Sequence, residues 1–115
     1  MNHKLEIVRG TTKSFGITVN DANGEPYTLH TGERLVFGLK RERRDANCVM
    51  VKTVQNSVDG EYYLELKPGD TADLDPGLYH YDIGLQMGSS VFYNIVPLSD
   101  FLILPNAARC GDADV

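Results

Sequence analysis

The chain has 115 residues, which is enough for one domain with a real core and too few for two independent ones. Hydrophobic residues make up 42% and charged residues 23%, an ordinary globular composition that argues against intrinsic disorder. The net charge of -5 disfavours nucleic-acid phosphates and anionic membrane surfaces as partners, because both require a basic footprint. We therefore expect a single domain over residues 1–105 and a polar, flexible tail over residues 106–115, with neither nucleic acid nor membrane as a partner.

The start of the sequence has no apolar stretch long enough for a signal peptide, and no window approaches the roughly 18 apolar residues of a membrane span. We expect synthesis in the cytoplasm. Cys48 and Cys110 lack the Cys-x-x-Cys spacing and the neighbouring histidines of a metal site. We interpret them as unpaired thiols.

Short segments of alternating apolar and polar residues follow one another along the chain, and no window of a dozen residues has a helical apolar stripe. The first strands are expected at residues 5–7 and 15–19. Between the second and third strands, "NDANGEPY" predicts a tight turn, because Gly24 accepts a positive φ and Pro26 fixes its own.

Further alternation predicts the remaining strands, at 35–39, 49–51, 62–66, 78–87, 91–96 and 99–105. The strands on either side of the charged segment "RERRDAN" fit one sheet or two. Short antiparallel strands at this density have apolar faces that must be covered. The sequence therefore predicts an all-β fold, an immunoglobulin-like antiparallel β-sandwich of about seven strands.

The segment "PGDTADLDPG" before residue 78 is too long for a hairpin and suits a chain that crosses from one sheet to the other. It offers a helical turn capped by Asp70 or Thr71 and an apolar plug in Leu74. The residues that follow have the Asp-x-Gly-x-Tyr form of a tyrosine corner, in which the tyrosine hydroxyl bonds to backbone upstream. The predicted structural corner comprises Asp75, Pro76, Gly77, Tyr79 and Tyr81.

The sequence does not predict a catalytic site. His3, His30 and His80 are scattered, and His80 with Asp82 on one strand face is typical of a solvated pair. Nucleophile, zinc, phosphate-loop and dinucleotide motifs are missing from the sequence. We expect no enzyme activity and no cofactor.

Two acidic turns offer oxygen atoms to calcium, but neither has the spaced glutamate of a calcium loop, and turns are rich in such residues for backbone reasons. The weak metal candidates are Asp21, Asn23 and Glu25 in the first turn and Asp70 and Asp73 in the second. A sugar platform requires exposed rings, and without tryptophan Tyr63 is the clearest candidate. A calcium- or carbohydrate-binding module remains the alternative function.

The C-terminal stretch "VFYNIVPLSDFLILP" is apolar on both faces, although a sandwich strand has only one dry face. The second apolar face predicts a subunit contact around Phe92, Val96, Leu102 and Leu104. The alternative is that a loop or the N-terminal segment of the same chain covers these residues.

Two segments resemble a known family. The opening "RGTTKSFGITVNDANGEPYTL" and the later "TADLDPGLYHYDIGL" are similar to motifs of the N-terminal immunoglobulin-like domain in the phage baseplate upper protein family and related prophage proteins. The resemblance covers most of residues 7–87. It implies a scaffold role for the matching residues, among them Asp82, and no catalytic role.

The resemblance implies a noncatalytic virion structural protein, an assembly or docking module of a tail, baseplate or head appendage. Its implied partners are other phage structural proteins or further copies of itself. Its implied location is the virion, after synthesis in the cytoplasm of the bacterial host. This chain ends soon after the domain, without the fibrous extension of the receptor-binding members, so a direct role in host recognition is not expected.

Overall fold

The computed structural model describes residues 3–58 and 60–106, so Cys110 and residues 107–115 of the expected tail lie outside the described residues. Along the described part, the elements are β1 (Leu5–Val8), β2 (Lys13–Ile17), β3 (Glu33–Lys40), β4 (Met50–Val54), β5 (Tyr62–Leu66), α1 (Pro68–Thr71), β6 (Gly77–Met87) and β7 (Val91–Leu104). The expectation of an all-β fold is confirmed. Among the described residues, no helix has the length and apolarity needed to cross a membrane.

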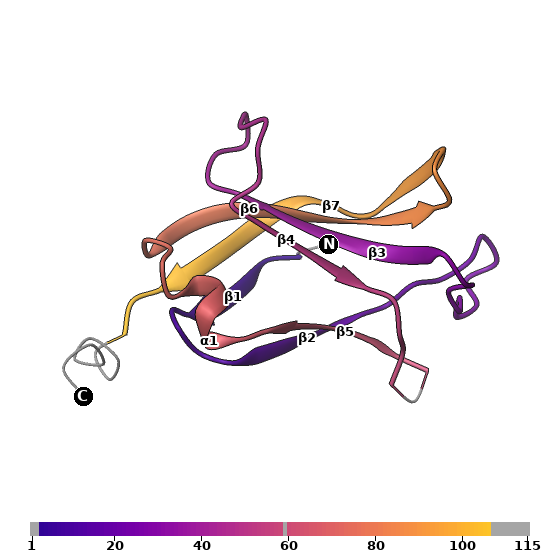
Figure 1. The fold of residues 1–115 in the computed structure, drawn as a ribbon, viewed down its shortest axis with the longest axis horizontal. Coiled ribbons are helices and arrows are strands. Elements are labelled where there is room, and N and C mark those ends of the chain that lie inside the picture. Colours follow the sequence, from indigo (N-terminus) through magenta and orange to yellow (C-terminus); the bar gives the residue numbers. More distant parts are fainter. Residues whose placement is uncertain (1–2, 59, 107–115) are drawn as a thin grey trace.

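The strands form two sheets (Figure 1). The larger has the order β1-β7-β6-β3-β4, and β2 pairs with β5 in the smaller. β1 runs parallel to β7, whereas the other strand pairs are antiparallel. β3 and β4 pair directly, so the strands around "RERRDAN" lie in one sheet.

The core lies between the two sheets, and its centre is a cluster of rings. Phe101 of β7 lies 6.1 Å from Phe15 of β2, 5.9 Å from Phe37 of β3 and 5.9 Å from Tyr81 of β6, measured between ring centroids. Alternation places these side chains inward, as expected from the period of two. Aromatic rings at such distances prefer tilted and edge-on contacts, and the observed angles of 59° to 75° fit that preference.

The segment between β5 and β6 crosses from the smaller sheet to the larger. Its helical turn begins earlier than expected: Lys67 is the N-cap, and the Asp70 carboxylate accepts a hydrogen bond from the Lys67 N–H at 2.8 Å. Thr71 is fully buried, and its hydroxyl accepts a hydrogen bond from the Gly10 N–H at 2.7 Å. Leu74 packs against the core. The crossover is thereby fastened to the turn between β1 and β2.

The start of β6 is fixed by Tyr79, whose ring is 2% exposed and whose hydroxyl donates to the Asp75 carbonyl at 2.7 Å. Burial raises the pKa of Tyr79, so the hydroxyl stays a donor. The Arg41 guanidinium lies 4.7 Å from the centre of this ring. Gly77 has φ of 143°, and a Cβ there would lie 3.2 Å from Arg41, so this position requires glycine.

β7 is one strand of 14 residues, where two strands, at residues 91–96 and 99–105, were expected. The pairing with β6 is irregular in the middle: Ile83 pairs with Val96 and Gly84 with Asn94, which leaves Ile95 as an extra residue. Pro97 lies in a second register shift, between the pairs Tyr81–Ser99 and Ile83–Val96, where its missing N–H disturbs no regular ladder. This second register shift lets one strand continue through the proline.

We predict that Tyr79→Phe lowers the free energy of unfolding by roughly 1 kcal/mol, because the Asp75 carbonyl loses a partly buried donor while the ring stays in place. Urea denaturation measures the change. Tyr63→Phe is the matched control, since its hydroxyl bonds to Glu61 at the surface. Equal effects of the two substitutions would contradict a special role for the corner.

Candidate functional site

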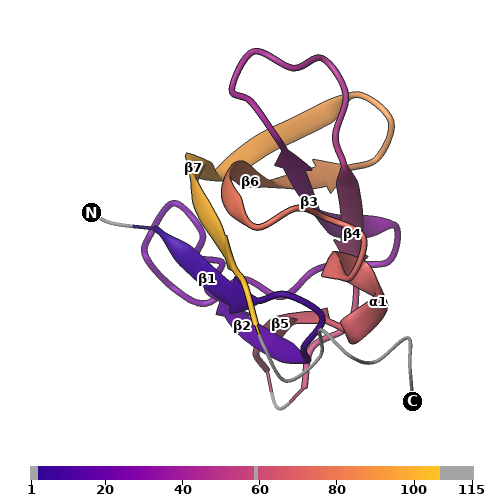
Figure 2. The same ribbon diagram turned by 90° about the vertical axis from the view of Figure 1, so that its left-hand side faces the viewer.

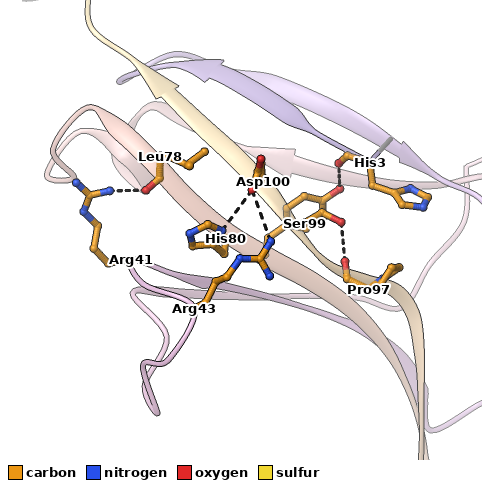
Figure 3. A network of polar contacts seen from close by, with 9 residues as sticks. His3, Arg41, Arg43, Leu78, His80, Pro97, Ser99 and Asp100 are labelled. Carbon is orange, nitrogen blue, oxygen red and sulfur yellow. Dashed lines mark hydrogen bonds and ion pairs between the residues drawn. The ribbon is translucent and has the colours of Figure 1, made fainter. Parts of the chain in front are cut away.

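A polar cluster (Figure 3) lies on the outer face of the larger sheet, because its residues on β6 and β7 alternate with the core residues Tyr79, Tyr81 and Phe101. His80 of β6 and Asp100 of β7 are cross-strand partners, with His80 Nδ1 at 3.4 Å from Asp100 Oδ1. Arg43 Nη2 lies 3.9 Å from the same oxygen. His80 is 8% exposed, so the expectation of a solvated pair with Asp82 is wrong. Asp82 instead accepts a hydrogen bond from the Asn94 side chain at 3.2 Å.

Two arginines beside this cluster join the loop after β3 to the larger sheet. His80 Nδ1 is buried and has no hydrogen-bond partner, although it lies near Asp100. The neighbouring hydroxyl, that of Ser99, donates to the Pro97 carbonyl at 2.7 Å and is not directed to the imidazole. Arg43 contacts Asp100, and Arg41 donates to the Leu78 carbonyl, so two arginines fasten the loop after β3 to the sheet.

Two of the carboxylates proposed as metal candidates, those of Asp21 and Asp70, accept hydrogen bonds from backbone N–H groups. Asp21 Oδ1 accepts hydrogen bonds from the N–H groups of Asn23 and Glu25 at 2.9 and 3.0 Å, which builds the turn. The structure brings neither acidic turn into a ligand set: among residues 3–58 and 60–106, no group of three or more acidic, histidine or cysteine side chains could hold a metal ion. Asp73 is exposed.

The carboxylate of Asp70 stabilises the fold through an ion pair and a hydrogen bond. Its Oδ1 lies 2.7 Å from Lys52 Nζ, and its Oδ2 accepts from the Lys67 N–H. Burial raises the pKa of Asp70, but the Lys52 ammonium and the Lys67 N–H lower it by more, so the pKa lies below the ordinary 3.8. The ionised form therefore joins β4 to the crossover.

The sequence analysis did not predict a second group of polar contacts, which involves Glu33 and Tyr62. Glu33 Oε1 accepts from the His30 N–H at 2.7 Å and from the Tyr27 hydroxyl at 2.8 Å, and these bonds lower the pKa of Glu33. Tyr62 of β5 accepts a hydrogen bond from the Leu29 N–H at 2.8 Å. The segment between the acidic turn and β3 is thereby tied to both sheets. The only feature of the sequence that pointed to this arrangement is the Asn-Gly turn, which reverses the chain direction before this segment.

The four residues expected at an interface do not form one patch. Phe92 is 54% exposed, and its ring lies on Gly84, where a Cβ would stand only 2.0 Å from Cζ. Val96 instead packs against the core, because the bulge pairs it with Ile83, so its assignment to the second apolar face is wrong. The expected side-by-side arrangement of Phe92 and Val96 assumed unbroken alternation.

Leu102 and Leu104 are half-buried at the other end of the outer face. Their cross-strand neighbours are exposed: Leu78 by 44% beside Leu102, and Val8 by 37% beside Leu104. The alternative of cover by the N-terminal segment does not hold for the described residues, because β1 lies alongside β7 at its edge and not over its face. Two apolar patches, at Phe92 and at Leu102, therefore flank the polar cluster.

A groove lies on the side of the molecule between β1 and β2. Its cavity of about 540 Å³ is lined by four consecutive residues of and after β2 (15–18) and by core side chains such as Ile83 and Ile95. A neighbouring hollow of about 430 Å³ shares Asn20 and Ile95 with it. The groove follows the edge of β2 that does not pair with β5.

The comparisons with known proteins assign no family. No family model matches the chain, and no curated protein matches it. Among solved structures, a "putative glycoside hydrolase" from Bacteroides vulgatus ATCC 8482 aligns with 93% of this chain and 17% of its own, at 12% identity and a TM-score of 0.49. The chain thus spans about a sixth of that protein, and a similarity of this size supports no assignment of fold or activity.

The lowered pKa of Asp70 predicts a pH dependence. The ionised carboxylate stabilises the fold above the unfolded-state pKa, and this stability is lost as the pH falls through the lower folded-state pKa. Asp70→Asn should therefore lower the free energy of unfolding by about 0.5–1 kcal/mol at pH 7 and much less at pH 2. Denaturant unfolding at the two pH values measures it, and an effect that does not depend on pH would contradict the ion pair.

Millimolar calcium should leave the melting temperature unchanged, because the oxygens of Asp21 and Asp70 are already bonded within the chain. Differential scanning calorimetry with calcium or EDTA tests this. A rise that is abolished by Asp21→Asn would instead establish the first acidic turn as a binding loop.

Proposed function

We propose that this chain is a noncatalytic docking module of a phage or prophage virion, part of a tail, baseplate or head appendage. The observation that carries the proposal is the outer face of the larger sheet. Exposed apolar side chains lie at both ends of this face, with Phe92 at 54% and Leu78 at 44%, where a solvent-facing sheet surface carries mostly polar residues. A second protein surface would bury both patches.

The polar cluster favours docking over chemistry. It holds the loop after β3 against the sheet through Arg41 and Arg43, so the face between the two patches is ordered before a partner arrives. Preorganisation lowers the entropic cost of binding. Phe92 is likewise held on Gly84 and offers its ring in a fixed position, as aromatic interface anchors do.

We assign the sandwich to the immunoglobulin-like class. Support comes from the division of seven strands into sheets of five and two, from the crossover between β5 and β6, and from the Tyr79–Asp75 hydrogen bond at that crossover. The virion assignment is supported by the sequence resemblance over residues 7–87. Its expected partners are other phage structural proteins, with self-association as a further mode.

The proposal predicts that Leu102→Glu disrupts assembly while unfolding stays cooperative, because a charge in a buried contact costs more than a charge in water. Light scattering coupled to size-exclusion chromatography, over a range of concentrations, measures the mass. Val58→Glu is the control, since Val58 is 62% exposed and lies outside the five-stranded sheet. A wild-type monomer at all concentrations that also fails to retain any co-expressed virion protein would contradict the docking role.

A further inference from the structure

The end of β3 and the loop that follows it are basic, although the protein as a whole is acidic. Residues 40–45 hold four cations, Lys40, Arg41, Arg43 and Arg44, against the carboxylates of Glu42 and Asp45, a net charge of +2 where the whole chain carries -5. In Figure 1 and in Figure 2, the loop between β3 and β4 extends beyond the larger sheet, on the side away from β2 and β5. A second protein can therefore reach this positive charge.

Two of the four cations are engaged within the chain and two are not. Arg41 and Arg43 are held against β6 and β7. Among residues 3–58 and 60–106, the side chains of Lys40 and Arg44 make neither a hydrogen bond nor an ion pair. Arg44 is exposed, and Lys40 lies on the outer face of the larger sheet as the cross-strand partner of His80. Both charges are available to a partner.

The carboxylates nearby do not balance these two charges. Asp82 and Asp100 on the same face are each contacted by a side chain of this chain. In the loop, the Asp45 carboxylate accepts a hydrogen bond from the Glu42 N–H at 3.0 Å and closes the turn. The Glu42 side chain has no contact with the residues that the structure describes, so the loop adds one free carboxylate against two free cations.

Exposed apolar side chains lie beside these cations. Leu78 is 44% exposed and is the cross-strand neighbour of Leu102. His80, the partner of Lys40 across β3 and β6, follows Leu78 by two residues, which is about 7 Å along a strand. This end of the outer face thus offers a pair of leucines to an apolar side chain and, next to them, positive charge to a carboxylate.

We propose that this end of the outer face binds an acidic segment of another protein, with apolar residues against Leu78 and Leu102 and carboxylates against Lys40 and Arg44. Complementary charge around an apolar contact selects the partner and speeds association more than it adds affinity. Two copies of this chain face to face would bring the same cations together, so the observations favour a different chain. The inference rests on the proposed docking function and names the chemistry of its partner.

A nucleic acid carries the same negative charge but fits this face less well. Affinity for nucleic acid grows with the number of phosphates that a protein neutralises, and two free cations neutralise few. The exposed leucines offer nothing to a phosphate, and the rest of the chain is acidic. The charge and the apolar surface together favour a protein segment.

Peptides test the inference on the intact protein by nuclear magnetic resonance. The probe is the acetylated and amidated peptide Asp-Glu-Leu-Leu-Glu-Asp. One control peptide replaces its acids by lysine, a second replaces its leucines by serine, and a short single-stranded oligothymidylate represents nucleic acid. We expect saturable shifts of the amide signals of residues 40–44, 78 and 102 with the probe alone. Its dissociation constant should rise severalfold between about 50 and 300 mM sodium chloride, because salt screens exposed charges.

Charge changes in the loop supply matched variants. Arg44→Glu and Lys40→Glu should each weaken the probe by about threefold to fivefold, and Glu42→Gln should strengthen it by about twofold. Arg44 and Glu42 are exposed, so neither of these loop changes disturbs the core. Lys67→Glu, at an exposed position between β5 and α1, should leave the affinity unchanged. Leu78→Ser should abolish saturable binding.

Three outcomes overturn the proposal. The first is the lack of any shift at probe concentrations up to about 5 mM. The second is binding of the lysine peptide or of oligothymidylate as tight as that of the probe, which would change the charge or the class of the partner. The third is self-association that Arg44→Glu and Glu42→Gln change in opposite directions, which would make a second copy the occupant.

The failure of this inference and the failure of the docking role are distinguishable. Loss of assembly in Leu102→Glu reports on the outer face whatever the charge of the partner. If that loss is observed while the probe does not bind, the docking role stands and the acidic partner is wrong. If the wild-type chain neither assembles nor retains a virion protein, the docking role itself is wrong.

Discussion

The unequal sizes of the two sheets are the constraint on which the rest of the structure depends. Phe15 of β2 reaches the ring cluster around Phe101, but two strands cannot cover the inner face of five. The remaining core must therefore be closed by other segments. The crossover with α1 and Leu74 closes part of it, and the segment between β2 and β3 closes another. The groove beside β2 is the part that no described segment covers.

Polar contacts fix these closing segments because the segments have few apolar residues of their own. Thr71 binds Gly10, Arg9 donates twice to the Ala72 carbonyl, and Glu33 binds Tyr27. Most of these contacts join a side chain to backbone, which satisfies groups that would otherwise be buried without partners. Asp21 and Asp70 bond to backbone N–H groups in the same way, so two of the acids that suggested a metal site in the sequence have a structural use.

The outer face of the larger sheet and the edge of β2 differ in the groups that they expose. The outer face presents side chains: two apolar patches and between them a cluster in which His80 is buried beside Asp100. The edge presents backbone.

Local sequence determined the strands, the turns and the inward side chains of β3, β5 and β6, because alternation with a period of two reports which face is buried. It also located the crossover and the tyrosine that bonds to Asp75. Tertiary structure alone decided the rest. The bulge at Ile95 moved Val96 into the core, a second register shift next to it carried β7 through Pro97, and pairing across strands gave His80 the partner Asp100 in place of Asp82. Register between distant segments is set by the packing of the whole sheet, which no local pattern contains.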